Sequence, residues 1–233
     1  MKSELLMMAL LCQAVYIKDD RERVTRFHEL GCACLAWLDN NGTQAVLLQS
    51  YSKYFLVFRG TDEPKDWLKD VDVRKTETPF GKVHNGFNEG VLAIWNDLVD
   101  ALQGNRVLSV TVCGHSKGAG EALIAAEWLQ HLYSSVRKAY LFGCPRAKGV
   151  AAPAPYFPIS RVVNNNDVIC RVPTPWRFRH FGQRYYISHK GDLVKGVTPW
   201  KIFKDRLSGR WASRNLLDGL SDHPIDKYVK ALT

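Results

Sequence analysis

The chain has 233 residues, of which 46% are apolar and 24% charged, and its formal net charge is +9. This composition is that of a folded globular protein and excludes a disordered or low-complexity chain. The length lies within the range of one large domain, so we expect a single domain over residues 1–233.

The apolar run LLMMALLCQAVYI near the N-terminus predicts a helix of the fold. Gln13 interrupts the run, no small-residue cleavage site follows it, and it is too short to span a bilayer. With no export signal evident, the six cysteines are interpreted as reduced core residues, and their spacing matches no zinc motif. We therefore expect a cytoplasmic protein without a bound metal.

Three β-rich stretches follow, over residues 32–38, 44–50 and 54–59. Asn40-Asn41-Gly42 predicts a turn between the first two, so this region is interpreted as a meander. Farther along, apolar residues spaced as on one helical face predict a crossover helix over residues 86–102.

The next stretch, residues 106–113, is rich in β-branched residues and predicts a buried strand directly before a strong helix-forming run, EALIAAEWLQHLY. Buried strands are also predicted over residues 138–142 and 161–164, with a weaker candidate over 185–188. Because strands alternate with helices, we expect an α/β fold with a mostly parallel central sheet and helices on both faces.

A candidate nucleophile lies between that strand and that helix. The sequence Gly114-His115-Ser116-Lys117-Gly118 has the Gly-X-Ser-X-Gly pattern, which depends on a strand before it and a helix after it. Ser116 would occupy a strained turn, and the backbone N–H of Lys117 would face an oxyanion formed on attack. His115 is expected to pack beneath the turn. A glycine-rich turn without chemistry is the competing interpretation.

A serine nucleophile needs a histidine base and an acid that orients the histidine. His223 lies on the loop before a predicted final helix with Pro224 at its first position, and a capping residue without chemistry is the alternative for this histidine. Asp167 follows an apolar strand at the edge where ligands of open α/β sheets bind. Asp222 is too near His223 in sequence to orient it easily from another strand.

The excess charge is concentrated in one segment. Residues 171–214 contain 11 of the 32 Lys and Arg residues but two of the 23 Asp and Glu residues, interspersed with aromatic side chains. This mixture suits an anionic interface, either lipid headgroups or nucleic acid, and a solvated, partly structured insertion is an equal alternative. His180 and His189 lie within this segment and are explained by either of those settings.

Several blocks in order, among them LVFRGTDEPKDWLKDV, KVHNGF, GHSKGAG, YLFGCPRAKG and RVVNNNDVICRVP, make the chain similar to the class 3 lipase family. The resemblance implies an α/β-hydrolase fold and the triad Ser116, Asp167 and His223, as selected above. It also implies that the backbone N–H of Thr61 joins that of Lys117 in an oxyanion hole, and that residues 62–78 form a lid with Trp67, Leu68 and Val71. The lysine after the serine departs from the hydrophobic residue that is more usual there.

These observations predict a lipase or esterase that hydrolyses lipid esters through an acyl-enzyme, without a cofactor, and phospholipase A1 activity is one form that this could take. The expected partners are a lipid or ester substrate and, at the periphery, an anionic membrane surface rather than nucleic acid; the oligomeric state stays open. The alternative is a catalytically silent protein that binds anionic membranes or nucleic acid through residues 171–214. A peptidase or acyltransferase on the same fold also remains open, because fold does not choose substrate.

Overall fold

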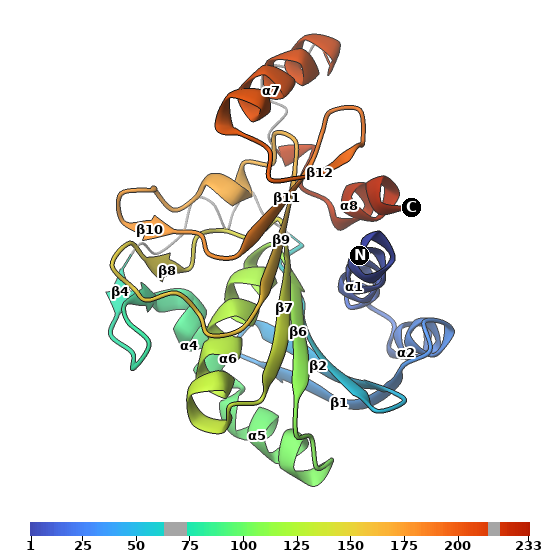
Figure 1. Ribbon diagram of the computed structural model, residues 1–233. Coiled ribbons are helices and arrows are strands. Elements are labelled where there is room, and N and C mark those ends of the chain that lie inside the picture. The colour runs from blue at the N-terminus through green and yellow to red at the C-terminus, as the bar shows by residue number, and fades with distance from the viewer. Residues whose placement is uncertain (63–73, 214–219) are drawn as a thin grey trace.

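The computed structural model describes residues 1–62, 74–213 and 220–233, and the side chains of 210–213 are not considered. An eight-stranded sheet forms its centre, with strand order β1-β2-β3-β6-β7-β9-β11-β12 (Figure 1). The strands are β1 (Ala33–Asn40), β2 (Thr43–Ser50), β3 (Lys53–Phe58), β6 (Val110–His115), β7 (Val136–Phe142), β9 (Ile159–Asn164), β11 (Gln183–Ile187) and β12 (Leu193–Lys195).

Neighbouring strands from β3 through β11 are parallel, whereas β1, β2 and β12 join the sheet antiparallel. The predicted meander and the mostly parallel sheet are therefore confirmed. Asn41 and Gly42 both have positive φ, at 49° and 74°, as the tight turn between β1 and β2 requires.

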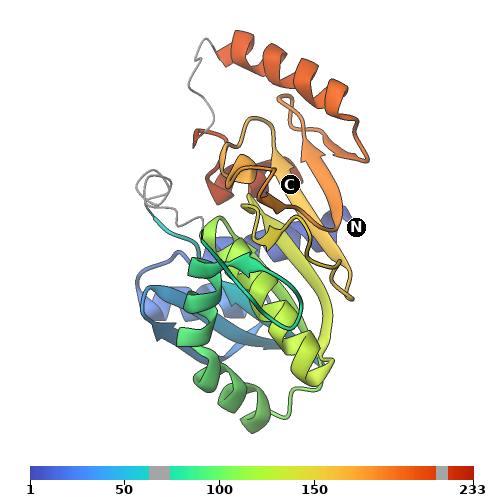
Figure 2. The same cartoon turned by 90° about the vertical axis from the view of Figure 1, so that its left-hand side faces the viewer.

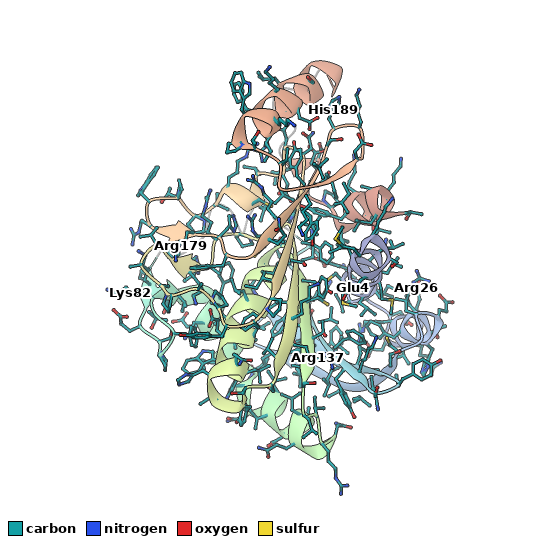
Figure 3. The ribbon with its side chains drawn as sticks, viewed as in Figure 1. Glu4, Arg26, Lys82, Arg137, Arg179 and His189 are labelled. Atoms are coloured by element: carbon teal, nitrogen blue, oxygen red, sulfur yellow. The ribbon has the colours of Figure 1, made fainter. Side chains whose placement is uncertain are left out.

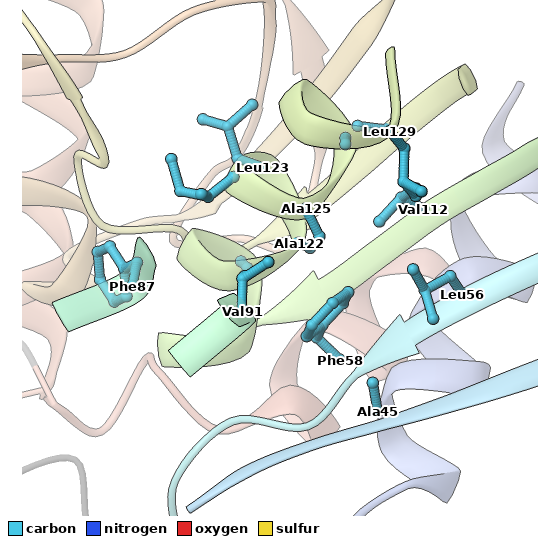
Figure 4. Close-up of a cluster of buried hydrophobic side chains, with 14 of the residues drawn as sticks. Ala45, Leu56, Phe58, Phe87, Val91, Val112, Ala122, Leu123, Ala125 and Leu129 are labelled. Carbon is cyan, nitrogen blue, oxygen red and sulfur yellow. The ribbon is translucent and has the colours of Figure 1, made fainter. Parts of the chain in front are cut away.

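Helices cover both faces of the sheet (Figure 1). On one face lie α4 (Asn85–Ala93), α5 (Trp95–Gly104) and α6 (Lys117–Tyr133); on the other lie α1 (Lys2–Ala14), α2 (Asp20–Glu29) and α8 (Ile225–Leu232). The strands supply both cores because their side chains alternate between faces. Leu56 and Phe58 of β3 pack in the core under α6, which Figure 4 shows, and Phe55 and Val57 pack in the core under α1.

The N-terminal apolar run is a helix of the fold, as predicted. In α1, Leu5, Met8, Leu11 and Cys12 are buried, and the helix packs against α8. All six cysteines of the chain lie in described residues and are free thiols. Within the described ranges, no helix is long and apolar enough to cross a membrane.

The crossover helix predicted over residues 86–102 is two helices, because the helical path breaks at Ile94 (φ −105°, ψ 6°) between α4 and α5. Buried Val91 and Leu98 lie on either side of the break and pack in the same core, so the apolar pattern continues across it. The next strand, β6, begins at Val110, later than predicted.

A second, smaller sheet was not predicted. It has the order β10-β8-β5-β4 and consists of β4 (Lys75–Thr76), β5 (Val83–His84), β8 (Lys148–Gly149) and β10 (Phe178–Arg179). Strands of two residues have no measurable period, so sequence patterning has nothing to detect in them.

The basic segment, residues 171–214, forms regular secondary structure in its described part and is not simply a solvated insertion. It contributes β10, β11, β12 and helix α7 (Pro199–Ser213), which projects beyond the rest of the molecule in Figure 2. Its histidines have specific partners. His180 Nε2 donates to the carbonyl of Cys170 at 2.8 Å. His189, labelled in Figure 3, lies beside α7, with its Nδ1 2.6 Å from a carboxylate oxygen of Asp205 in that helix. Simple solvation of these two histidines is therefore wrong.

Candidate active site

Ser116 lies at the sharp turn where β6 ends and α6 begins. Its backbone has φ 59° and ψ −131°, a strained conformation for a residue with a side chain. Glycines on both sides are required by close backbone approach, because a Cβ on Gly114 would lie 2.3 Å from the carbonyl oxygen of Gly118. A Cβ on Gly118 would in turn lie 2.5 Å from that of Arg59. The predicted strand, turn and helix are thus all present, and Ser116 itself is fully buried.

Asp167 and His223 meet although 56 residues separate them. Asp167 follows β9 and His223 precedes α8, and Nδ1 of the histidine lies 2.8 Å from Oδ2 of the aspartate, with both side chains buried. The backbone N–H of Ile169 donates to the other carboxylate oxygen at 2.9 Å. Burial raises the pKa of Asp167, but hydrogen bonds from His223 and Tyr228 outweigh it and the net pKa is lowered.

Tyr228 is a member of this site that sequence reasoning missed. Its hydroxyl donates to Asp167 Oδ2 at 2.5 Å and accepts from the backbone N–H of Asn164 at 3.2 Å. The signal that could have found it is the hydroxyl, since a buried tyrosine normally has a hydrogen-bond partner.

Asp222 joins the loop that carries the acid to the loop that carries the histidine. One of its carboxylate oxygens accepts from the side chain of Asn165 and from the backbone N–H of Asn166, both at 3.1 Å. Its carbonyl accepts from the side chain of Asn164 at 2.8 Å. Asp222 therefore does not orient His223 directly, as expected, but it fixes the separation of the two loops.

His115 packs against the ring of His223, in agreement with its predicted position beneath the turn. The two imidazole rings stack with centroids 4.7 Å apart. Nε2 of His115 lies 2.9 Å from the carbonyl oxygen of His223 and must donate to it, so Nδ1 accepts from the hydroxyl of Tyr16 at 2.8 Å. Burial lowers the pKa of His115 to about 3, so the ring is neutral and both of its nitrogens are engaged.

Ser116 and His223 are not hydrogen-bonded to one another in this structure. Among the described residues, neither Oγ of Ser116 nor Nε2 of His223 has a hydrogen-bond partner, and both atoms are buried. Catalytic hydrogen bonds are often long or poorly aligned without substrate. The structure thus brings Asp167 and His223 into direct contact and brings Ser116 next to the histidine that stacks on His223.

Thr61 lies beside the serine, because a Cβ on the preceding Gly60 would be 3.0 Å from Cβ of Ser116. Thr61, His115 and His223 line one cleft of about 440 Å³. The predicted lid residues Trp67, Leu68 and Val71 lie outside the described residues.

The side chain of Lys117 has a structural partner. Its ammonium lies 2.7 Å from Oε1 of Glu121, one turn along α6, and donates to the carbonyl of Gly42 at 2.8 Å. Glu121 is fully buried and also accepts from the hydroxyl of Thr43. The lysine that departs from the usual hydrophobic residue therefore neutralises a carboxylate under the turn, while its backbone N–H begins α6.

The solved structures that share this fold include two that are described here. One is of a triacylglycerol lipase, with 22% sequence identity, a TM-score of 0.68 and 79% of each chain covered. The other is of the protein MDLA of Penicillium cyclopium, with 16% identity, a TM-score of 0.73, and 95% of this chain and 93% of that chain covered. These similarities establish the α/β-hydrolase fold.

A secreted mono- and diacylglycerol lipase of Malassezia globosa is 30% identical over 203 residues. The match covers 75% of this chain and 64% of that protein, so the chain spans slightly less than two thirds of its relative. The expectation of a cytoplasmic protein is wrong on this comparison, because the relative is secreted. That expectation depended on interpreting the N-terminal run as a helix, and a helix of the fold carries no information about the compartment.

The same blocks that suggested a family in the sequence lie within a formal family match. Residues 55–176, slightly more than half of the chain, match the family Lipase (class 3). The match begins within β3 and includes the elbow at Ser116 and the acid loop at Asp167. The chain therefore belongs to the class 3 lipase family.

Proposed function

We propose that the chain hydrolyses lipid esters through an acyl-enzyme on Ser116. The observation that carries this proposal is the buried hydrogen bond between Asp167 and His223 beside a serine held in a strained turn. The family membership supports the same chemistry, and the triacylglycerol lipase with this fold has a triad of the serine-protease type.

In the proposed reaction, Nε2 of His223 accepts the proton of Ser116 as the serine oxygen attacks the ester carbonyl. Asp167 holds Nδ1 of the histidine and stabilises the imidazolium that forms. The backbone N–H groups of Thr61 and Lys117 donate to the oxyanion, at the positive end of α6. His223 then returns its proton to the leaving alcohol, and a water molecule hydrolyses the acyl-enzyme by the same steps.

The names of the relatives support a proposal for the substrate class. The relative from Malassezia is named for mono- and diacylglycerols, and the structural neighbour for triacylglycerols. We therefore propose acylglycerols as substrates, with phospholipids cleaved as by a phospholipase A1 as the second candidate because the molecule carries a basic surface. That surface includes Lys201 and Lys204 on α7.

Helix α7 supports peripheral contact with an anionic lipid surface. Trp200, Phe203 and Leu207 are exposed at helical spacing, and the rings of Trp200 and Phe203 stack. Lysines lie between these apolar side chains, which is the arrangement of helices that lie in a membrane interface. In the proposed orientation, the aromatic rings enter the interface and the ammonium groups contact headgroup phosphates.

Labelling by a fluorophosphonate tests the proposed chemistry. The intact chain should be labelled, Ser116→Ala should not, and Ser208→Ala, which changes an exposed serine on α7, should be labelled as the wild type is. A series of p-nitrophenyl esters of increasing chain length, with phospholipid alongside, then identifies the preferred substrate. A wild-type chain that is not labelled but still binds vesicles or DNA in a salt-sensitive way would favour the silent binding protein.

A further inference from the structure

The loop that carries the proposed acid turns sharply at Asn165. The turn runs from Asn164 to Asp167, and the backbone N–H of Asp167 closes it by donating to the carbonyl of Asn164 at 2.8 Å. Asn165, the second residue of the turn, has φ 32°. A positive φ is uncommon for residues other than glycine, and asparagine is one of the few that adopt it readily. Because Asp167 is the last residue of the turn, the conformation of Asn165 helps to determine where the carboxylate lies.

The side chain of Asn165 joins this turn to the residue before the proposed base. The side chain is buried, and its Nδ2 donates to Oδ2 of Asp222 at 3.1 Å. The same carboxylate oxygen accepts from the backbone N–H of Asn166, also at 3.1 Å. Asp222 directly precedes His223 in the chain. The acid and the base are therefore fixed relative to each other by a second route, in addition to the direct hydrogen bond between Asp167 and His223.

The backbone of Asn165 is held by β11 and by α7. Its N–H donates to the carbonyl of Ile187 at 2.9 Å, and its carbonyl accepts from Nε of Arg206 at 2.9 Å. Helix α7, which lies beyond the ends of β11 and β12 in Figure 1, also comes close to the side chain. A Cβ on Gly209 would lie 2.9 Å from Nδ2 of Asn165. The helix thus packs directly on the residue that joins the acid loop to the base.

Helix α7 has its own fixed position on the sheet. The carboxylate of Asp205 accepts from the hydroxyl of Tyr186 at 2.8 Å and from the backbone N–H of His189 at 3.0 Å. Ile202 is buried and packs in one cluster with residues of β9 and β11. Because these contacts fix the helix, they also fix the place from which Arg206 donates to the acid loop.

We propose that Asn165 is a positioning residue for ester hydrolysis and that Arg206 of α7 holds it in place. This inference rests on the proposed function. Asn165 lies outside the described lining of the cleft and acts through Asp167 and His223. A small displacement of the acid from the base weakens their hydrogen bond, which depends steeply on distance and angle, and so weakens the stabilisation of the imidazolium. Loss of this positioning should lower kcat and leave KM little changed.

A double-mutant cycle on a p-nitrophenyl ester tests the link between Asn165 and Asp222. Asn165→Asp keeps the size of the side chain but places a second carboxylate against that of Asp222, so kcat near pH 8 should fall at least about tenfold. Adding Asp222→Asn restores one donor and one acceptor, so the double variant should be more active than Asn165→Asp alone. The single variant Asp222→Asn completes the cycle. Additive losses in the double variant would overturn the proposal.

The proton between Asp167 and His223 gives a readout that a loss of stability alone does not move. Its downfield resonance in ¹H NMR is identified by its disappearance in Asp167→Asn. The resonance should shift or broaden in Asn165→Asp and return toward the wild-type position in the double variant. Asn88→Asp is the control, because it places a carboxylate at a buried asparagine of α4 whose side chain accepts from Trp128. An unchanged resonance in folded Asn165→Asp, or the same change in Asn88→Asp, would overturn the proposal.

Two variants of Arg206 test the part of α7 and still decide the proposal if Asn165→Asp fails to fold. The amide nitrogen of a glutamine lies as many bonds from Cα as Nε of an arginine, so Arg206→Gln keeps a donor for the carbonyl of Asn165. Arg206→Met has no donor, and both variants lose the charge. We expect kcat to fall clearly in Arg206→Met, with KM little changed, and to stay near the wild-type value in Arg206→Gln. Equal kcat values in the two variants would overturn the role of Arg206.

Failure of this inference differs from failure of the proposed function. A wild type that neither reacts with a fluorophosphonate nor hydrolyses the ester would remove the proposed function, and the proton resonance, which needs no substrate, would then test the positioning alone. A wild type that is active, with Asn165→Asp equally active, would remove the positioning role and leave the proposed function intact.

Discussion

Removing the ammonium of Lys117 should destabilise the fold, although the role proposed for Lys117 in the reaction involves its backbone N–H and not its side chain. In Lys117→Met the buried Glu121 carboxylate loses its ion pair and keeps the hydroxyl of Thr43 as a hydrogen-bond donor. Removing one partner of a buried pair costs about 3–5 kcal/mol. The lysine side chain is 21% exposed, and the carboxyl group can take up a proton, so we expect the lower part of this range, about 3 kcal/mol. For a chain of this length that corresponds to a fall in Tm of about 6–12 °C.

Urea unfolding at two pH values measures this effect and its origin. Burial raises the pKa of Glu121, and Lys117 partly counteracts the rise, so the pKa should rise further in Lys117→Met. When the pKa of a carboxyl group is higher in the folded than in the unfolded protein, the free energy of unfolding falls as the pH rises from the unfolded-state pKa toward the folded-state pKa. The deficit of the variant should therefore be smaller near pH 5 than near pH 8.

Two further variants isolate the pair. Lys138→Met removes a lysine whose partner, Glu4, is largely exposed at 3.7 Å, and it should change the stability by less than about 1 kcal/mol. Lys117→Met combined with Glu121→Gln should recover part of the loss at pH 8, because no unpaired charge is then buried at position 121. A deficit in Lys117→Met as small as that of Lys138→Met, or one that does not depend on pH, would refute the reasoning.

Three other predictions concern the proposed catalytic site. Asp167→Asn keeps the shape of the site but no longer stabilises the imidazolium of His223, so kcat on a p-nitrophenyl ester should fall by about 10⁴-fold while the protein stays folded by circular dichroism. Tyr228→Phe removes one hydrogen bond that lowers the pKa of Asp167, so kcat should fall by about tenfold with KM little changed. The acidic limb of the pH–rate profile should move to higher pH, and an unchanged profile would count against a positioning role for Tyr228. Gly118→Ala places a Cβ 2.5 Å from the carbonyl oxygen of Arg59, so the variant should lose both activity and several degrees of Tm, and full activity would contradict the close approach.

The sequence predicted the elements whose signal is local. The apolar run of α1, the turn between β1 and β2, and the sequence of strand, Gly-X-Ser-X-Gly and helix around Ser116 are each contained within one short stretch. The division of the predicted crossover helix at Ile94 was missed, because both halves present the same apolar face. A domain that spans all 233 residues stays a prediction.

The contacts that sequence reasoning missed join distant segments. Tyr228 and Asp167 are 61 residues apart, and the tyrosine fits an apolar helix face as well as it fits a hydrogen bond. Asp222 was considered only as a partner of His223, whereas it binds the loop at Asn165 and Asn166. Arg184 was recognised as part of the basic segment, but its neighbour Arg161 was not, since Arg161 lies outside that segment and meets Arg184 only through the register of two strands.

The contact between α1 and α8 has a consequence during synthesis of the protein. Ser116 leaves the ribosome more than a hundred residues before His223, so the growing chain carries the proposed nucleophile before its proposed base. Tyr16, which follows α1, donates to His115, whose other ring nitrogen donates to the carbonyl of His223, and Gln13 donates to Asp226 of α8. These contacts of the N-terminal segment can form only after the C-terminal segment has emerged. The proposed ester hydrolysis therefore requires α8 and the loop before it to have packed against the rest of the fold.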